Sequence, residues 1–317
     1  MKTVLVTGAA GFIGSNLTKT LLEEGYKVVG VDNFDDTYDL AFKEGNIASF
    51  LENPDFKLER IDIRDLDVLT AVFAAEKPAY VVHLAAKADT RKAVAVPRLY
   101  VSVNIDGTLN ILELCREYPV ENLIIASSSS VYGNSSSAPF TEDQSADRPL
   151  SPYGATKRSI ELFAHSYHHN FNMNITCLRF FNAHGEHNRP NMVPYVWTEK
   201  LLHGEEIEMS GDGNRKRDYT YIGDIVRGTI LAMEKPLGFE VINLGNTTPA
   251  SLNELLAIFE KVIGIQAKVK IRPSHPASVD ETYANISKAK QLLGWEPTTS
   301  LEEGITRLVA WYRANRL

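Results

Sequence analysis

The sequence predicts an α/β fold with a doubly wound parallel sheet and a smaller α/β lobe at the C-terminal end. Two observations support this prediction. Short and almost wholly apolar runs alternate with helical patterns through the first half of the 317 residues, which is typical of a parallel sheet that helices cover on both faces. The chain is also too long for one typical core, which indicates a large unit with a smaller partner.

The alternation begins with a strand at 3–8 and a helix at 12–25 that ends at Gly25. The later strands of the sheet are expected at 27–32, 56–62, 79–86, 122–129, 174–181 and near 240–244. Helices are expected at about 66–75, 98–117, 152–170, 222–235 and 251–263, and "KVKIRP" (268–273) is a further strand before closing helices at 287–294 and 301–314. We divide the chain into a larger domain, 1–181 with 218–248 returning to it, and a smaller lobe, 182–217 with 249–317.

Composition and charge exclude several classes of function. The net charge is −7, with 33 Lys and Arg against 40 Asp and Glu, and no basic run stands out, so nucleic acid is not an expected partner. The two cysteines, Cys115 and Cys177, lie far apart in apolar surroundings, as free thiols of a reducing compartment do. We expect no metal site. We also expect no membrane span, because no apolar run reaches about 18 residues, and we expect a cytoplasmic location.

A glycine-rich turn joins the first strand to the first helix. Gly8, Gly11 and Gly14 have the spacing GxxGxxG, with Phe12 and Ile13 between them. The first two glycines allow a tight turn and a close approach of the backbone to a pyrophosphate, and the third lets the helix pack on the sheet. This arrangement predicts a dinucleotide site in a Rossmann-type domain.

Acidic residues at two later strand ends add to this prediction. Asp32 ends the second strand, 18 residues after Gly14, where a carboxylate binds a ribose 2′-hydroxyl and repels a 2′-phosphate, so NAD is favoured over NADP. Asp62 ends the third strand and is a candidate for the adenine. The full set of candidate cofactor residues is Gly8, Gly11, Phe12, Ile13, Gly14, Asp32, Asn33, Asp62, Ile63, Leu84, Ala85, Ala86, Tyr153 and Lys157.

A serine cluster and a Tyr–Lys pair supply candidate chemistry. Ser127 to Ser130 run off the end of an apolar strand, and Tyr153 is the one tyrosine of 13 that has a lysine four residues on. In a helix these two side chains share one face. The ammonium of Lys157 and the positive nicotinamide of NAD⁺ are expected to lower the phenol pKa from its ordinary value near 10 toward neutrality. Tyr153 would then take a proton from a substrate hydroxyl while hydride leaves the same carbon.

These motifs, in this order, resemble the extended short-chain dehydrogenase/reductases, and specifically the NAD-dependent nucleotide-sugar epimerases and dehydratases. The resemblance extends to "HLAA" (83–86), "RDYTYIGDI" (217–225) and "LGWEP" (293–297). It implies tightly held NAD, a smaller lobe that binds a nucleotide diphosphate sugar, and a homodimer formed through helices of the larger domain. It also implies that Ser128, Tyr153 and Lys157 form the catalytic triad.

The branch within this family can be tested against residues. The dehydratases carry an Asp-Glu pair after the catalytic Ser or Thr, whereas this chain has Ser129 and Ser130. The UDP-glucuronate decarboxylases carry Glu directly before "VYG", where this chain again has Ser130. "DNFDDTYDLAFKEGNI" (32–47) and "NRPNM" (188–192) resemble UDP-glucuronate 4-epimerases, but "NMVPYV" (191–196) also resembles UDP-galactose 4-epimerases.

Arg189 is the residue that discriminates between these branches. A guanidinium can hold a planar carboxylate in two parallel charge-assisted bonds, although it can also hold a phosphate. Arg217 is a candidate for the diphosphate, and Asn182 for the substrate or diphosphate region. The candidate substrate-binding residues are Arg91, Ser128, Ser129, Tyr153, Asn182, Arg189, Met192, Val193, Arg217 and Asp280.

The sequence therefore predicts NAD-dependent 4-epimerisation of a UDP-sugar through a 4-keto intermediate, with UDP-glucuronate converted to UDP-galacturonate. The alternatives are a 4-epimerase of UDP-glucose or UDP-N-acetylglucosamine, a UDP-glucuronate decarboxylase, and a non-catalytic regulator that binds NAD and a nucleotide sugar. Replacing Tyr153 with Phe separates an enzyme from a regulator.

Overall fold

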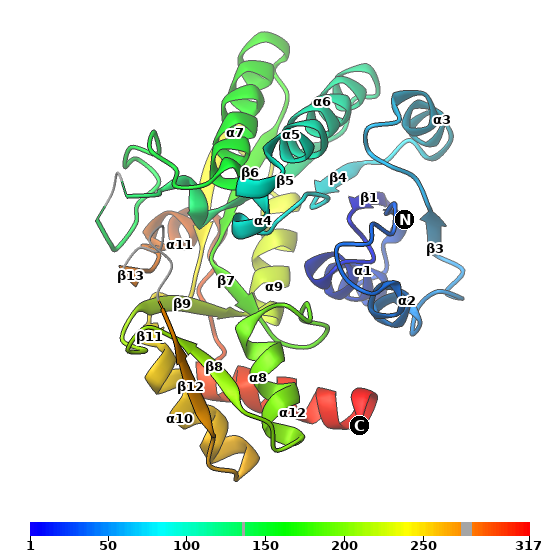
Figure 1. Cartoon of the computed structure of the whole chain (residues 1–317). Coiled ribbons are helices and arrows are strands. Elements are labelled where there is room, and N and C mark those ends of the chain that lie inside the picture. Colours follow the sequence, from blue (N-terminus) through cyan, green and yellow to red (C-terminus); the bar gives the residue numbers. More distant parts are fainter. Residues whose placement is uncertain (135–136, 274–280) are drawn as a thin grey trace.

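A seven-stranded sheet forms the centre of the larger part of the computed structural model, which describes residues 1–134, 137–273 and 281–317 (Figure 1). All neighbouring strands are parallel, in the order β10-β6-β5-β4-β1-β2-β3. The order reverses between β1 and β4, where ligands bind in open α/β sheets. The strands are β1 (Thr3–Thr7), β2 (Lys27–Val31), β3 (Phe56–Glu59), β4 (Tyr80–His83), β5 (Asn122–Ser128), β6 (Ile175–Phe180) and β10 (Phe239–Leu244).

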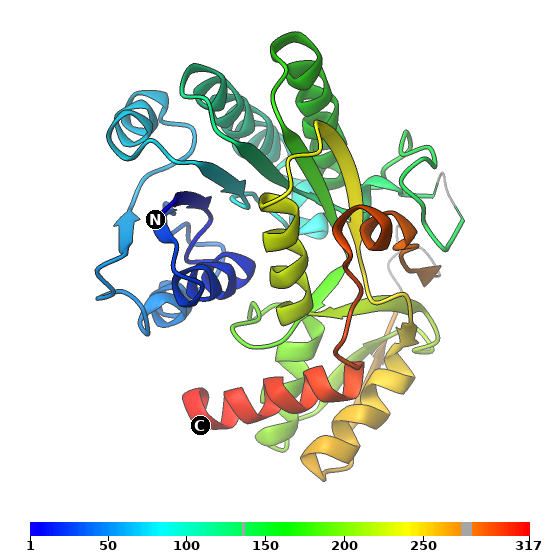
Figure 2. The same cartoon turned by 180° about the vertical axis from the view of Figure 1, so that it is seen from behind.

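Helices cover both faces of this sheet because successive strand residues point to opposite sides. Val4 and Val6 of β1 enter one apolar core with α1 and α9, whereas Leu5 enters the other with α3, α6 and α7. Figure 2 shows α9, in yellow-green, against the first of these faces. The helices of the larger part are α1 (Phe12–Glu23), α2 (Leu40–Ile47), α3 (Leu66–Glu76), α4 (Thr90–Ala95), α5 (Pro97–Tyr100), α6 (Gly107–Glu117), α7 (Pro152–Phe171), α9 (Ile222–Met233) and α11 (Ser287–Leu293).

The smaller lobe has its own core below the carboxyl ends of the sheet strands. Trp197, Phe259 and Leu308 meet there from three different helices. Its elements are β7 (Asn182–His184), α8 (Val193–Leu202), β8 (Ile207–Ser210), β9 (Lys216–Tyr221), β11 (Pro249–Ser251), α10 (Leu252–Ile263), β12 (Val269–Arg272), β13 (Glu281–Thr282) and α12 (Leu301–Arg316).

The predicted fold class is confirmed, and each predicted strand of the large sheet is present within a few residues. The prediction of one long helix at 98–117 was wrong. This stretch consists of α5, a π-helical segment, η1 (Val101–Asp106), and α6. The sequence analysis did not predict α2, α4, α8 or the short strands β7, β8, β9, β11 and β13. These elements are too short for their apolar spacing to show a period.

The predicted division of the chain stays a proposal. In its support, β10 lies in the large sheet beside β6. Two elements differ from this division. The strand β9 crosses the predicted boundary at 217/218 and pairs with β7, β11 and β13, and α11, within 249–317, packs against α9 and β10 of the larger part. Within the described ranges, no helix is both long and apolar enough to cross a membrane.

Candidate active site

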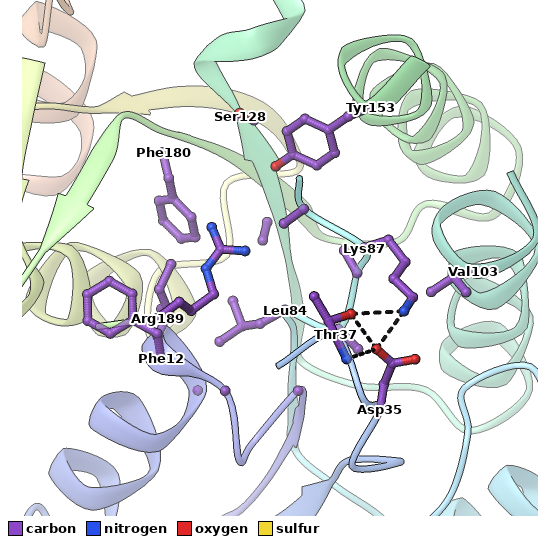
Figure 3. A pocket seen from close by; sticks show the side chains of 18 of the residues that line it. Phe12, Asp35, Thr37, Leu84, Lys87, Val103, Ser128, Tyr153, Phe180 and Arg189 are labelled. Atoms are coloured by element: carbon purple, nitrogen blue, oxygen red, sulfur yellow. Dashed lines mark hydrogen bonds and ion pairs between the residues drawn. The ribbon is translucent and has the colours of Figure 1, made fainter. Parts of the chain in front are cut away.

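A cavity of about 420 Å³ runs over the carboxyl ends of β1 to β6 (Figure 3). The turn after β1 forms one end of the cavity, and the side chains of Tyr153 and Arg189 face each other at the other end. Most of the predicted site residues line it. They are Gly8, Gly11, Phe12, Ile13, Gly14, Asp32, Asn33, Asp62, Ile63, Leu84, Ala85, Ala86, Ser128, Ser129, Tyr153, Lys157, Asn182, Arg189 and Met192.

The glycine turn leaves no room for side chains. Gly8 has a φ of +73°, and a Cβ atom on Gly14 would lie 2.0 Å from the Gly8 carbonyl oxygen. Gly8 donates its N–H to the carbonyl of Val31 at 2.7 Å, which ties the turn to the end of β2. The turn and the free N–H groups at the start of α1 therefore form a cradle that fits a pyrophosphate.

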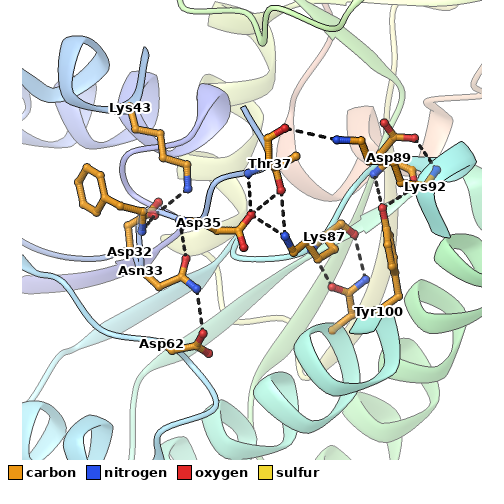
Figure 4. A network of polar contacts seen from close by, with 12 residues as sticks. Asp32, Asn33, Asp35, Thr37, Lys43, Asp62, Lys87, Asp89, Lys92 and Tyr100 are labelled. Atoms are coloured by element: carbon orange, nitrogen blue, oxygen red, sulfur yellow. Dashed lines mark hydrogen bonds and ion pairs between the residues drawn. The ribbon is translucent and has the colours of Figure 1, made fainter. Parts of the chain in front are cut away.

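Asp32 lies buried at the end of β2, where its carboxylate is held in place (Figure 4). Its Oδ2 accepts the N–H of Ala10 at 3.1 Å, and its Oδ1 accepts the N–H of Phe34 at 2.8 Å. Lys43 of α2 donates to Oδ1 at 3.1 Å, and both side chains of this ion pair are less than a tenth exposed. Lys43 lies in the segment 32–47 that resembles UDP-glucuronate 4-epimerases, but it was not predicted as a site residue.

Asp62 follows β3, the strand next to β2, and lies beside Asn33 (Figure 4). It accepts from Asn33 Nδ2 at 2.8 Å and from the Arg64 guanidinium at 2.8 and 2.9 Å. The Arg64 side chain is the main cause that lowers the pKa of Asp62 to about 2. Asp62 is therefore an acceptor at neutral pH, already oriented by two neighbours.

A second polar group, which the sequence analysis also missed, closes the cavity between the loops that follow β2 and β4. Lys87 Nζ donates to Asp35 Oδ1 at 2.5 Å and to Thr37 Oγ1 at 2.9 Å, and all three residues line the cavity (Figure 4). Asn104 of η1 fixes the backbone of Lys87, accepting its N–H at 2.8 Å and donating to its carbonyl at 3.1 Å. We call the contacts among Asp35, Thr37 and Lys87 the loop latch.

The Tyr–Lys pair lies at the start of α7. Ser151 caps this helix by accepting the N–H of Gly154 at 3.1 Å, and Pro152 occupies the first turn, where a missing N–H costs nothing. Tyr153 is 8% exposed, and its ring packs edge-on against Tyr100 with centroids 6.5 Å apart. The helix start therefore fixes where the phenol points, which is into the cavity (Figure 3).

The electrostatics of the pair differ from the expectation. Burial raises the pKa of the Tyr153 phenol, and the hydrogen bond with Ser128 and the charge of Arg189 only partly oppose it. Lys157 donates to the carbonyl of Ala126 at 2.6 Å, and its Nζ lies 6.0 Å from the centre of the Tyr153 ring. Burial lowers the pKa of Lys157 to about 8. In the protein alone the phenol is protonated at neutral pH, so the expected lowering of its pKa by Lys157 is not what the structure shows.

Arg189 points into the cavity from the loop before α8, and Figure 3 shows it beside Phe180 and facing Tyr153. Its Nη2 lies 3.5 Å from Met192 Sδ. Among the described residues it is the one arginine that lines the cavity, and no carboxylate there pairs with it. Of the other lining cations, Lys43 and Lys87 already have acidic partners, and Lys157 donates to the carbonyl of Ala126.

Three predicted residues of the described part of the chain do not line the cavity. Arg91 is exposed on α4, Val193 is 38% exposed at the start of α8, and Arg217 lies on β9 with Nη1 donating to its neighbour's carbonyl at 2.7 Å. Asp280 lies outside the described residues. No group of three or more acidic, histidine or cysteine ligands that could hold a metal occurs in the described part of the chain.

Comparisons with known proteins agree with this geometry. The family model described as GDP-mannose 4,6 dehydratase matches residues 5–308. The chain is 44% identical over 312 residues to a UDP-glucuronate 4-epimerase of Thermodesulfobacterium geofontis, covering 98% of this chain and 96% of that protein.

Solved structures extend the similarity to three dimensions. The UDP-glucuronic acid 4-epimerase of Bacillus cereus, in complex with UDP-glucuronic acid and NAD, is 38% identical with a TM-score of 0.93, over 98% of this chain and 99% of that one. The UDP-glucose 4-epimerase of Thermotoga maritima, with UDP-glucose, is 33% identical with a TM-score of 0.91, over 98% and 99%.

Proposed function

The chain belongs to the GDP-mannose 4,6 dehydratase-like family of extended short-chain dehydrogenase/reductases, and on this basis we propose that it is an NAD-dependent UDP-sugar 4-epimerase that converts UDP-glucuronate to UDP-galacturonate. One observation carries the choice of sugar. Arg189 is an arginine without a carboxylate partner among the described residues, and it faces Tyr153 inside the cavity. A planar carboxylate on the sugar suits its two parallel donors.

The cofactor site fits NAD. The glycine cradle accommodates the pyrophosphate, and the Asp32 and Asp62 carboxylates supply acceptors for the adenosine half. NAD, when bound, accepts a hydride from C4 of the sugar and returns it. Because hydride leaves and returns, the reaction has no net redox change and needs no external NADH.

The proposed proton chemistry belongs to Tyr153. Its phenolate oxygen takes the proton of the C4 hydroxyl, Ser128 bridges that hydroxyl and the phenol, and Lys157 supplies positive charge one turn along α7. Burial keeps the pKa of Tyr153 high in the protein alone. The phenol therefore becomes a base only when more positive charge enters the cavity, and a positively charged nicotinamide supplies it.

A carboxylate at C5 makes the 4-keto sugar prone to losing CO₂. The β-keto acid decarboxylates most readily when its carboxylate C–C bond is aligned with the carbonyl π system. Two parallel bonds from Arg189 would hold this C–C bond out of that alignment, and so preserve the 4-keto sugar until the hydride returns.

The test incubates the purified protein separately with UDP-glucuronate, UDP-glucose and UDP-N-acetylglucosamine, without added NADH, and resolves the C4 epimers. We expect UDP-galacturonate from the first at the highest kcat/KM. If UDP-glucuronate gave UDP-xylose or a released keto-pentose as its only product, the proposal would be refuted. The Tyr153→Phe variant should keep its NAD and lose turnover, whereas a non-catalytic regulator would keep its function.

We also propose a homodimer and a cytoplasmic location. Exposed apolar side chains lie on the neighbouring α4, α5, η1 and α7, namely Val94, Val96, Leu99, Val101, Leu162 and Phe163. Burying such side chains against a second copy would stabilise a dimer. Sedimentation should give twice the chain mass, and Leu162→Glu should lower it. The buried free thiols Cys115 and Cys177 support a reducing compartment.

A further inference from the structure

A buried ion pair lies directly behind the Ser128–Tyr153–Lys157 end of the cavity. Glu161 of α7 and Arg179 of β6 form two parallel bonds, Nε to Oε1 and Nη2 to Oε2, both 2.8 Å long. Their side chains are 1% and 2% exposed. The Arg179 guanidinium also stacks on the ring of Tyr132, 4.6 Å from its centre.

Glu161 is connected to both sides of the proposed chemistry, through β5 and through α7. Ser127, next to Ser128, donates its hydroxyl to Glu161 Oε1 at 2.5 Å. Glu161 lies one helical turn after Lys157 on α7. Ser127 therefore ties the end of β5 to α7 through Glu161, and Arg179 ties β6 to the same carboxylate.

Stability alone is a weak explanation for this arrangement. Taking two charges out of water costs about as much free energy as their attraction returns, and apolar side chains of similar volume often stabilise a core as well. What apolar side chains cannot supply is direction, because two parallel bonds and a hydroxyl bond fix both distance and angle. Buried ionic groups that cost stability have been found to fix geometry.

We propose that Glu161 and Arg179 are positioning residues for the epimerase reaction, and that with Ser127 they hold Ser128 at a fixed place relative to Tyr153 and Lys157. The proposal rests on the proposed function of the site. Reacting groups misplaced by about 1 Å lose roughly a hundredfold in rate. Loosening the link between β5 and α7 should therefore reduce kcat while leaving the glycine cradle and Arg189 unchanged.

The decisive variant is Glu161→Met/Arg179→Met, which removes both charges of the parallel pair together. Arg158 Nη1 also donates to Glu161 Oε2 at 3.0 Å, but its side chain is 29% exposed, so water can solvate the charge that loses its partner. We expect it to fold, to keep wild-type NAD content and KM within about twofold, and to lose at least about tenfold in kcat. Hydrogen exchange should rise in peptides that cover residues 126–130 and 152–157. A folded, NAD-loaded variant with wild-type kcat and exchange would overturn the proposal.

Ser127→Ala is the second variant, and it keeps the test decisive if the double variant fails to fold. It removes only the hydroxyl that joins β5 to Glu161, and we expect kcat to fall about fivefold with KM unchanged. Wild-type kcat in Ser127→Ala would overturn the proposal.

Glu296→Gln is the matched control, because it breaks the exposed Lys290–Glu296 pair and should change none of these quantities. Absence of turnover in the wild-type protein would refute the proposed function instead. The exchange measurement would then still report whether the pair orders these two segments.

Discussion

The loop latch leads to a prediction about how long the protein retains its cofactor. Asp35 accepts from Lys87 at 2.5 Å and from the Thr37 N–H at 3.0 Å, and the pair fastens the loop after β2 to the loop after β4 over the cavity. Burial raises the pKa of Asp35, but the hydrogen bonds from Lys87 and Thr37 outweigh it and bring the pKa below its ordinary value. The latch is therefore charged throughout the neutral range.

Asp35→Asn keeps the shape and one acceptor oxygen but removes the charge. A hydrogen bond to a charged group contributes about 1.5–3 kcal/mol, against about 0.5–1.5 kcal/mol for a neutral one. The side chains of Lys87 and Asp35 are 16% and 28% exposed, so partial screening keeps the expected loss near 1 kcal/mol. A weaker latch should therefore release NAD about fivefold faster, since about 1.4 kcal/mol corresponds to tenfold.

Release of NAD can be measured by diluting the purified holoenzyme into excess alcohol dehydrogenase and ethanol, which convert free NAD to fluorescent NADH. Asp36→Asn is the matched control, because Asp36 is exposed one position further on and loses the same charge. Equally slow release from both variants, below the wild-type rate, would mean that general repulsion of an anionic cofactor sets the rate and the latch does not. Unchanged or slower release in Asp35→Asn would refute the reasoning.

Three further predictions follow from the cavity. Arg189→Met should raise KM for UDP-glucuronate about tenfold or more, from loss of a charge-assisted pair, with little change for UDP-glucose; equal losses for both sugars in steady-state kinetics would contradict the carboxylate assignment. Gly14→Ala should abolish NAD retention, because its Cβ would lie 2.0 Å from the Gly8 oxygen; a variant purified with full NAD content would contradict this. Burial lowers the pKa of Lys157 to about 8, whereas the ordinary pKa of a lysine is about 10.4. Between these two pH values the unfolded state binds a proton that the native state lacks. The free energy of unfolding should therefore rise with pH across this range. Urea titrations should show that rise in the wild type and a smaller one in Lys157→Met, and parallel curves would contradict it.

The sequence predicted the large sheet well because its strands are buried on both faces and therefore appear as short apolar runs. The glycine turn was also predictable, because only glycine fits where the backbone of Gly14 lies against the carbonyl oxygen of Gly8. The apolar run of each strand and the glycine turn are both local features, because each depends on fewer than ten consecutive residues.

Asp35 and Lys87 escaped prediction because their partners are distant in sequence. Lys87 is 52 positions from Asp35, and no periodicity relates two loops that the sheet order brings together. Arg91 and Arg217 show the opposite case. Both were predicted to bind the substrate, and this role stays a prediction, because the structure places Arg91 on an exposed helix and Arg217 on a strand outside the cavity lining.

The pKa of Tyr153 shows why a catalytic group is hard to evaluate from spacing. An i,i+4 pair indicates that a lysine is near a phenol, and this suggests a lowered pKa. The spacing does not indicate how deeply the phenol is buried or where the ammonium is directed, and here burial raises the pKa while Lys157 bonds to a backbone carbonyl. A base that forms only when positive charge enters the cavity would suit a redox-neutral reaction, because the apo protein would then hold no reactive phenolate. Proton removal and hydride transfer would then both depend on bound NAD. Because the loop latch is expected to retain NAD, it should also affect turnover.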